Sequence, residues 1–234
     1  MLKSALTLAK LTLAGIALAA VLSSPAGAQG SQKPQKGANY VELTPAQPTD
    51  SPGKVEVVEF FWYGCPHCYK LEPLVNLWEK KLPKDAVFKR VPAVFNEQWG
   101  IAAQVYYTLD ALNEEHRLRA PLFDAIHKEN LKITDESDVT AWMGKHGVDP
   151  ARYKATFHSF AVQTALNRAT QMTKTYGITG VPTFVVQGRY VAGAELNGDE
   201  QPLLDVTSYL IDEVKKGGSS AEKAAAPKKK VAAQ

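Results

Sequence analysis

Two cysteines, Cys65 and Cys68, lie three positions apart in the motif Cys-Pro-His-Cys, and they are the only cysteines of the chain. A largely apolar run, Val55 to Trp62, precedes them almost directly. If this run forms a strand and the segment after the motif a helix, Cys65 lies at the helix N-terminus. Backbone N–H groups and the helix dipole favour a thiolate at that position. The pattern therefore predicts a reactive dithiol that can close into a Cys65–Cys68 disulfide.

The cysteine count excludes several other roles. Two cysteines cannot form a framework of structural disulfides, and they cannot supply a four-cysteine zinc site within one chain. Haem attachment through C-x-x-C-H also fails, because Tyr69 follows Cys68. We expect no metal and no cofactor. Four further histidines have no ligand-like spacing, and we expect surface or helix-terminal roles for them: His116, His127, His146 and His158.

The N-terminal segment, residues 1–28, has the layout of a cleaved secretory signal. Lys3 and Lys10 precede an apolar run from Leu11 to Val21, and the small-residue site Ala26-Gly27-Ala28 follows. The alternative is a membrane anchor, but the apolar run is shorter than the roughly 20 residues that span a bilayer. We therefore expect export to an oxidising compartment, where disulfides form and persist.

The formal net charge of +3 comes from the two ends of the chain. Lysines outnumber acidic residues in the signal segment and in the C-terminal tail, so the intervening body is net acidic. This balance argues against nucleic-acid binding by the folded part. The Lys- and Ala-rich tail, residues 217–234, is predicted to be disordered. Its cluster Lys228–Lys230 could contact anionic lipid, although a solvated tail is the simpler interpretation.

The remaining sequence predicts one domain with an insertion. Residues 29–53 are expected to form a flexible leader with one short edge strand near Tyr40–Leu43. The other predicted elements are strands at 54–62, 86–94, 183–186 and 189–191 and helices at 69–82 and 201–215, with Gln187-Gly188 as a hairpin turn. Between the two halves, residues 97–169 carry only helical patterns. Because C-x-x-C opens a helix within a βαβ pattern, residues 54–216 are predicted to form an α/β, thioredoxin-like fold with an all-helical insertion.

The sequence resembles the DsbA family of periplasmic thiol:disulfide oxidases. The resemblance rests on residues 59–69, Glu-Phe-Phe-Trp-Tyr-Gly-Cys-Pro-His-Cys-Tyr, on the helical block, and on residues 180–184, Gly-Val-Pro-Thr-Phe. It covers nearly all of residues 40–216. It departs from the family pattern in the Lys-rich tail and in the segment around Lys89–Pro92.

The resemblance implies a periplasmic protein that donates its disulfide to newly exported, unfolded proteins with free thiols. We expect this protein to be a monomer. It also implies a quinone-linked membrane partner of the DsbB type that reoxidises the dithiol. Two other functions stay open at this point. One is a disulfide isomerase or reductase on the same fold, and the other is a peptide-binding chaperone whose cysteines are idle.

Seven residues are the candidate site. Cys65 is the expected nucleophile because it precedes Cys68 at the exposed end of the helix, and the intervening Pro66 and His67 complete the motif. The charge of His67 is expected to favour the Cys65 thiolate, with a turn residue facing water as the alternative.

The last three members of the candidate site lie outside the motif. In thioredoxin-like folds a cis proline is expected at Pro182, which leaves the backbone of Val181 to pair with substrate. Glu59 shares a strand face with apolar residues, which predicts a raised pKa and a proton exchange with Cys68. A strand-end Glu59 that reaches solvent is the alternative.

Overall fold

The structure is a computed structural model, and it describes residues 33–225 of the chain. In chain order the elements are β1 Val41–Glu42, β2 Val55–Phe61, α1 Pro66–Glu79, β3 Ala86–Pro92, α2 Glu97–Ala111, α3 Glu115–Lys128, α4 Glu136–Lys145, α5 Pro150–Phe157, α6 Phe160–Thr175, β4 Thr183–Val186, β5 Tyr190–Gly193, α7 Ala194–Asn197 and α8 Glu200–Ala225. This order confirms the prediction of a thioredoxin-like α/β fold with a helical insertion.

The strands form one mixed sheet in the order β1-β5-β4-β2-β3. Strand β2 lies between its parallel neighbour β3 and its antiparallel neighbour β4. All seven residues of β2 are buried, as expected for a strand that is covered on both faces. The end of this central strand leads directly into the Cys-Pro-His-Cys motif.

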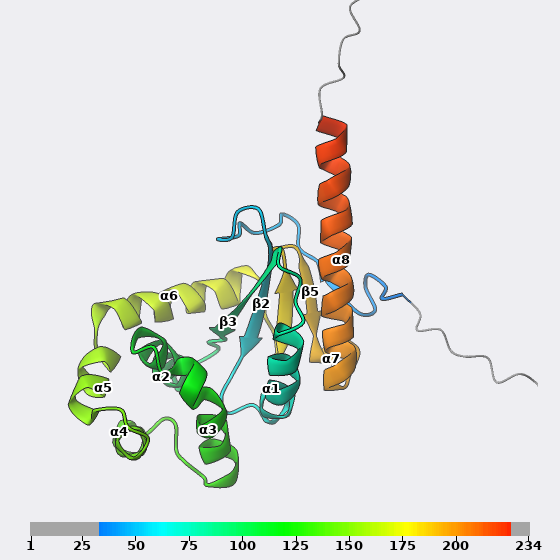
Figure 1. Cartoon of the computed structure of the whole chain (residues 1–234). Helices are drawn as coiled ribbons and strands as arrows, with labels where there is room; N and C mark the ends of the chain where they lie inside the picture. The colour runs from blue at the N-terminus through cyan, green and yellow to red at the C-terminus, as the bar shows by residue number, and fades with distance from the viewer. Residues whose placement is uncertain (1–32, 226–234) are drawn as a thin grey trace, which may run out of the picture. The chain divides into compact units, whose positions relative to one another are not determined.

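Alternate residues of β2 enter different cores, as the pleat of a strand requires. Val57 packs with Leu71 of α1 and Leu203 of α8 on one face of the sheet. Phe60 packs with Ala169 of α6 on the other face. Figure 1 shows α1 and α8 near the sheet and the five helices α2 to α6 grouped beside it.

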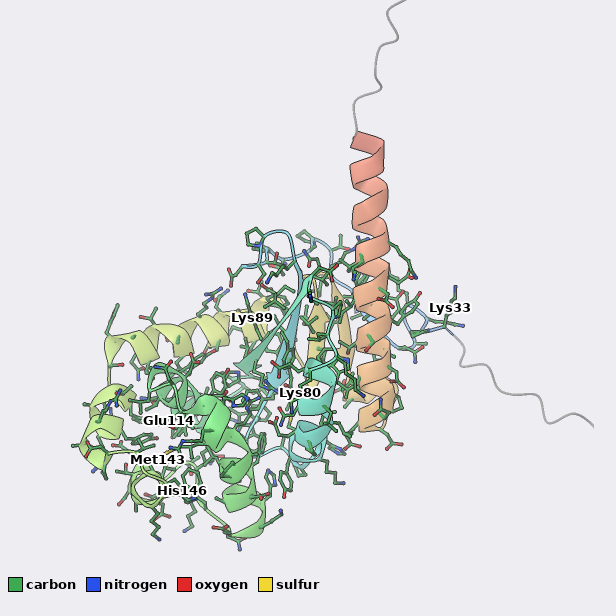
Figure 2. All side chains as sticks on the ribbon, in the orientation of Figure 1. Lys33, Lys80, Lys89, Glu114, Met143 and His146 are labelled. Atoms are coloured by element: carbon green, nitrogen blue, oxygen red, sulfur yellow. The ribbon has the colours of Figure 1, made fainter. Side chains whose placement is uncertain are left out.

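The helical block between β3 and β4 has its own core, which includes the fully buried Met143 that Figure 2 labels on α4. Four of its five helices begin where the sequence supplies a capping side chain, and α3 has none. The oxygens of Asn96, Asp135, Asp149 and Ser159 each accept a hydrogen bond from a backbone N–H group in the first turn, which satisfies donors that a helix start leaves unpaired.

The β4–β5 hairpin turns at Gln187 and Gly188, which have positive φ angles of 54° and 59°. Two positive φ angles are the mark of a type I′ turn, which suits the twist of a two-stranded hairpin. The backbone of Gln47 passes close by, so that a Cβ on Gly188 would lie 2.1 Å from the Gln47 carbonyl oxygen. The predicted turn is therefore present, and its second position has room only for glycine.

Several parts of the organisation differ from the sequence predictions or fall outside the described residues. Helix α6 ends at Thr175 rather than near 169, and α8 continues to Ala225, through the first part of the tail that was expected to be disordered. The short helix α7 was not predicted. The signal segment and residues 226–234 lie outside the described residues. Within residues 33–225, no helix combines the length and apolar character needed to cross a bilayer.

Candidate active site

The two cysteines lie at the start of α1, where β2 ends. Cys65 is the N-cap residue of α1, Pro66 occupies the first turn, and the Cys65 sulfur accepts a hydrogen bond from the Cys68 backbone N–H at 3.3 Å. Proline suits this turn because its missing N–H would have no helical partner there. Both cysteines are free thiols, so the geometry is that of the reduced protein.

The surroundings of the two thiols shift their pKa values in opposite directions. The hydrogen bond from the Cys68 thiol is the largest cause that lowers the pKa of Cys65 to about 6, with help from the backbone N–H groups of Cys68 and His67 and against the effect of burial. Burial is the largest cause that raises the pKa of Cys68 well above its ordinary value. Cys65 is also the more exposed of the two, with 6% of its surface accessible to solvent against 2% for Cys68. Near neutral pH the site therefore presents a thiolate at Cys65 and a thiol at Cys68.

His67, between the cysteines, has a side chain that is 61% exposed, and its Nδ1 lies 3.5 Å from Oε1 of Glu200. Its charge contributes to the lowered pKa of the Cys65 thiol. Glu200 is the first residue of α8, where a carboxylate is favoured by the helix dipole. The histidine thus faces solvent, as one interpretation of the sequence expected, and also joins the active-site turn to α8.

The loop before β4 closes the other side of the Cys65 sulfur. The Val181–Pro182 peptide bond is cis, as expected. The Cys65 sulfur lies 3.5 Å from the Val181 carbonyl oxygen, to which it donates only in its protonated form. Sheet pairing of β4 with β2 begins only at Thr183, so Val181 lies beside the sulfur and outside the ladder.

Glu59 is 2% exposed and lies on β2, where it is paired with β3 on one side and β4 on the other. Burial raises its pKa to about 7, an effect that the positive charge of Arg90 partly offsets. The Arg90 Nε lies 3.2 Å from Glu59 Oε2. The negative charge of Glu59 in turn contributes to the raised pKa of Cys68. The raised pKa expected for Glu59 is thus present, and the alternative in which this side chain reaches solvent is wrong.

Comparison with known proteins identifies the family. Residues 78–197 match the model of the DSBA-like thioredoxin domain. The thiol:disulfide interchange protein DsbA of Pseudomonas syringae is 40% identical over 195 residues, which cover 83% of this chain and 91% of that protein. The chain belongs to the DsbA family. DsbA of Bordetella parapertussis is 42% identical over 207 residues, covering 87% of this chain and 96% of its own.

Solved structures of DsbA proteins agree with this assignment. The crystal structure of Pseudomonas aeruginosa DsbA superposes with a TM-score of 0.76 at 38% identity, covering 80% of this chain and 97% of that one. DsbA from Xylella fastidiosa superposes with a TM-score of 0.74 at 32% identity, covering 78% of this chain and 98% of that one. As a DsbA-family member, the chain is a disulfide oxidoreductase.

Three residues contact this DsbA-type site that the sequence did not single out: Arg90, Glu200 and His127. Arg90 lies directly opposite Glu59 in the register of β2 and β3, so a charged residue within a predicted strand was a usable signal. Glu200 and His127 gave no such signal, because their contacts depend on how α8 and α3 pack. His127 lies in the last turn of α3, the helix-terminal place expected for it, and its ring also bonds to the backbone of Tyr63, just before the motif.

Proposed function

We propose that this protein is a disulfide donor that oxidises newly exported proteins through a mixed disulfide at Cys65. The observation that carries the proposal is the opposite shift of the two thiol pKa values, to about 6 at Cys65 and upward at Cys68. A stabilised thiolate on the enzyme favours the reduced enzyme, and this makes the enzyme disulfide a stronger oxidant. The direction of transfer follows from this preference.

In the first step a client thiolate attacks the Cys65 sulfur of the oxidised enzyme. A client–Cys65 disulfide forms, the Cys65–Cys68 bond breaks, and Cys68 leaves with the electron pair. Its raised pKa means that Cys68 takes up a proton near neutral pH. Glu59, with a pKa near 7, is a carboxyl that is protonated in part of the population at that pH, and we assign it the supply of this proton.

In the second step another client thiolate attacks the client sulfur of the mixed disulfide. The client disulfide forms, the client–Cys65 bond breaks, and Cys65 leaves as a thiolate. The N–H groups at the start of α1 and the charge of His67 stabilise this leaving group. Two electrons have then passed from client to enzyme, which is left as the dithiol.

Val181 is the proposed docking point for the client backbone. Its carbonyl oxygen lies 3.5 Å from the Cys65 sulfur, and it precedes the first paired residue of β4. An extended peptide can add to such an edge through main-chain hydrogen bonds. Because those bonds are independent of side chains, a client of almost any sequence can be held next to Cys65 and Pro182.

The proposed compartment is the periplasm, with residues 1–28 as the export signal. The clients are unfolded exported proteins with free thiols. Restoring the enzyme disulfide requires an acceptor for two electrons, for which we propose a quinone-linked membrane protein of the DsbB type. The relatives named as thiol:disulfide interchange proteins support the chemistry of this cycle.

Cysteine substitutions combined with a redox titration test the proposal. Cys68→Ser should accumulate mixed disulfides with client proteins, because the competing thiol is gone, and Cys65→Ser should form none. Equilibration with glutathione should give a potential well above that of a reductase. A low potential would favour the reductase or isomerase alternative, and client protection by the Cys65→Ser/Cys68→Ser variant without any oxidation would favour a chaperone.

A further inference from the structure

Three residues on one face of α3 contact the same tyrosine. The Tyr69 hydroxyl donates to Asp124 Oδ1 at 2.6 Å, and the Lys128 Nζ lies 5.6 Å from the centre of the Tyr69 ring and 2.8 Å from Asp124 Oδ1. The His127 ring stacks on the Tyr69 ring with centroids 4.6 Å apart and planes 3° from parallel. Residues three and four apart share a helix face, so α3 holds Tyr69 from its hydroxyl and its ring face together.

His127 also holds the backbone on the other side of the motif. Its Nε2 lies 2.8 Å from the Tyr63 carbonyl oxygen. A carbonyl oxygen only accepts hydrogen bonds, so the Nε2 of His127 is the donor. Tyr63 lies two residues before Cys65, and Tyr69 lies one residue after Cys68. One side chain of the helical block therefore contacts both flanks of Cys-Pro-His-Cys.

Both contacts are made at points that determine the geometry of the Cys65 sulfur. The Tyr63 carbonyl belongs to the peptide that enters Gly64 and then Cys65. Tyr69 donates its backbone N–H to the Cys65 carbonyl oxygen at 3.0 Å, the first helical hydrogen bond of α1. Hydrogen bonds weaken steeply as their distance and angle leave the optimum. The bonds that reach the Cys65 sulfur from Cys68 and His67 depend on this same turn.

We infer that His127 is a positioning residue of the redox site, which acts through Tyr63 and Tyr69 to keep the first turn of α1 aligned with the Cys65 sulfur. This role rests on the proposed function, because it acts on the Cys65 thiolate. It assigns to the helical insertion a part in tuning the dithiol. A purely structural role for His127 would alter the stability of the fold and leave the chemistry of Cys65 unchanged.

Two substitutions separate the two contacts of His127. His127→Phe keeps a ring to stack on Tyr69 and removes the donor to Tyr63, whereas His127→Gln keeps an N–H donor at a comparable reach and removes the ring. His116→Gln is the matched control, because His116 is an exposed histidine on the same helix.

The measurements are the thiolate absorbance of Cys65 against pH, the glutathione redox potential and the melting temperature. In His127→Phe we expect the pKa of the Cys65 thiol to rise by about half a unit, as expected for loss of part of one hydrogen bond. The corresponding threefold loss of thiolate stabilisation lowers the potential by about 15 mV. We expect His127→Gln to retain more of the wild-type values than His127→Phe, and His116→Gln to match wild type. Unchanged Cys65 titration in both His127 variants, or a fall in melting temperature alone, would overturn the inference.

A spectroscopic measurement on the unmodified protein covers the case in which a variant does not fold. Nitrogen NMR of labelled histidine should show the neutral His127 ring protonated at Nε2. A ring protonated only at Nδ1 could not donate to the Tyr63 carbonyl oxygen and would contradict the inference. Failure of the proposed function has a different signature, because then the Cys68→Ser variant of otherwise native protein would trap no client.

Discussion

At the scale of single residues, two identical thiols become different reagents because of their surroundings. Hydrogen bonds from Cys68 and from the helix start lower the pKa of the Cys65 thiol to about 6, whereas burial raises that of Cys68. Burial also raises the pKa of Glu59 to about 7. These shifts link the stability of the protein to pH and to redox state.

The first prediction concerns the reduced protein. The pKa of Cys65 is lower in the folded dithiol than in the unfolded chain, so its contribution to stability is complete above the ordinary thiol pKa of about 8.5 and is lost as pH falls through about 6. The oxidised protein has no such thiol. We expect denaturant titrations to show that the reduced protein becomes more stable relative to the oxidised protein as pH rises from 6 to 8. A difference that is constant over this range would contradict the low Cys65 pKa.

The second prediction concerns Glu59. A folded pKa near 7 means that wild type loses stability as pH rises from the unfolded carboxyl value of about 4.3 to 7, because over this range the unfolded chain releases a proton that the buried side chain retains. Glu59→Gln removes this ionisation. The unfolding free energy of the variant, relative to that of wild type, should therefore increase by on the order of 3 kcal/mol between pH 4 and pH 8. Urea unfolding at both pH values measures this gain, and equal pH profiles for the two proteins would show that Glu59 ionises as freely as in water.

At the scale of secondary-structure elements, turns and helix starts fix which side chains meet. The β4–β5 turn needs positive φ at Gln187 and Gly188, and β1 is held to β5 by antiparallel pairing beside it. The chain near Gln47 runs close to this turn, since the Gln47 N–H donates to the Gly188 carbonyl oxygen at 2.8 Å. The hairpin is thus linked to the edge strand by the pairing of β1 with β5 and to the segment after β1 at Gly188.

Gly188→Ala tests this close approach. The new Cβ would lie 2.1 Å from the Gln47 carbonyl oxygen, at a residue whose φ is also positive, so both a clash and backbone strain oppose it. We expect a loss of more than about 2 kcal/mol in unfolding free energy. Gly177→Ala is the matched control, because Gly177 has φ +61° and nothing within 4 Å of its Cβ position. It should lose only about 1 kcal/mol, and equal losses for the two variants would contradict the role of the contact.

At the scale of the whole described domain, the sheet and the helical block meet through a row of buried charges. Arg90 of β3 reaches the buried Glu59 and Glu72, and Arg119 of α3 reaches the same Glu72 of α1 and Glu115. Breaking a buried pair is costly because it leaves a charge without a partner or water. The charges therefore set how the insertion sits against the strand that carries the active site.

Arg119→Ala is predicted to destabilise the protein by about 3–5 kcal/mol, since it leaves the buried Glu72 without this partner. Arg117→Ala is the control on the same helix. Arg117 is about half exposed and pairs with Glu114, so its loss should cost less than about 1 kcal/mol. Chemical denaturation compares the two variants, and similar costs for both would show that the buried row contributes little.

Much of the candidate site could be predicted because it is local in sequence. The strand before the motif, the helix after it, Cys65 at the helix start and the raised pKa of Glu59 all follow from neighbours within a few residues or from the period of two along β2. The helical insertion was predicted for the same reason. Helix ends were less well predicted. Helix α6 continues past residue 169 because residues 170–175 contain no glycine or proline, whereas α8 continues past Lys215 through Gly217 and Gly218, which disfavour a helix.

The sequence by itself determined the dithiol, the order of the strands and of the helices other than α7, and the turn at Gln187-Gly188, since short-range spacing and backbone preference are sufficient for these features. The tertiary structure decided which distant side chains complete the site. Arg90 faces Glu59 only through the parallel register of β2 and β3, Glu200 meets His67 only because α8 begins beside α1, and His127 reaches Tyr63 and Tyr69 only because α3 packs against the motif. Contacts of this kind depend on the packing of whole elements, which no local pattern specifies.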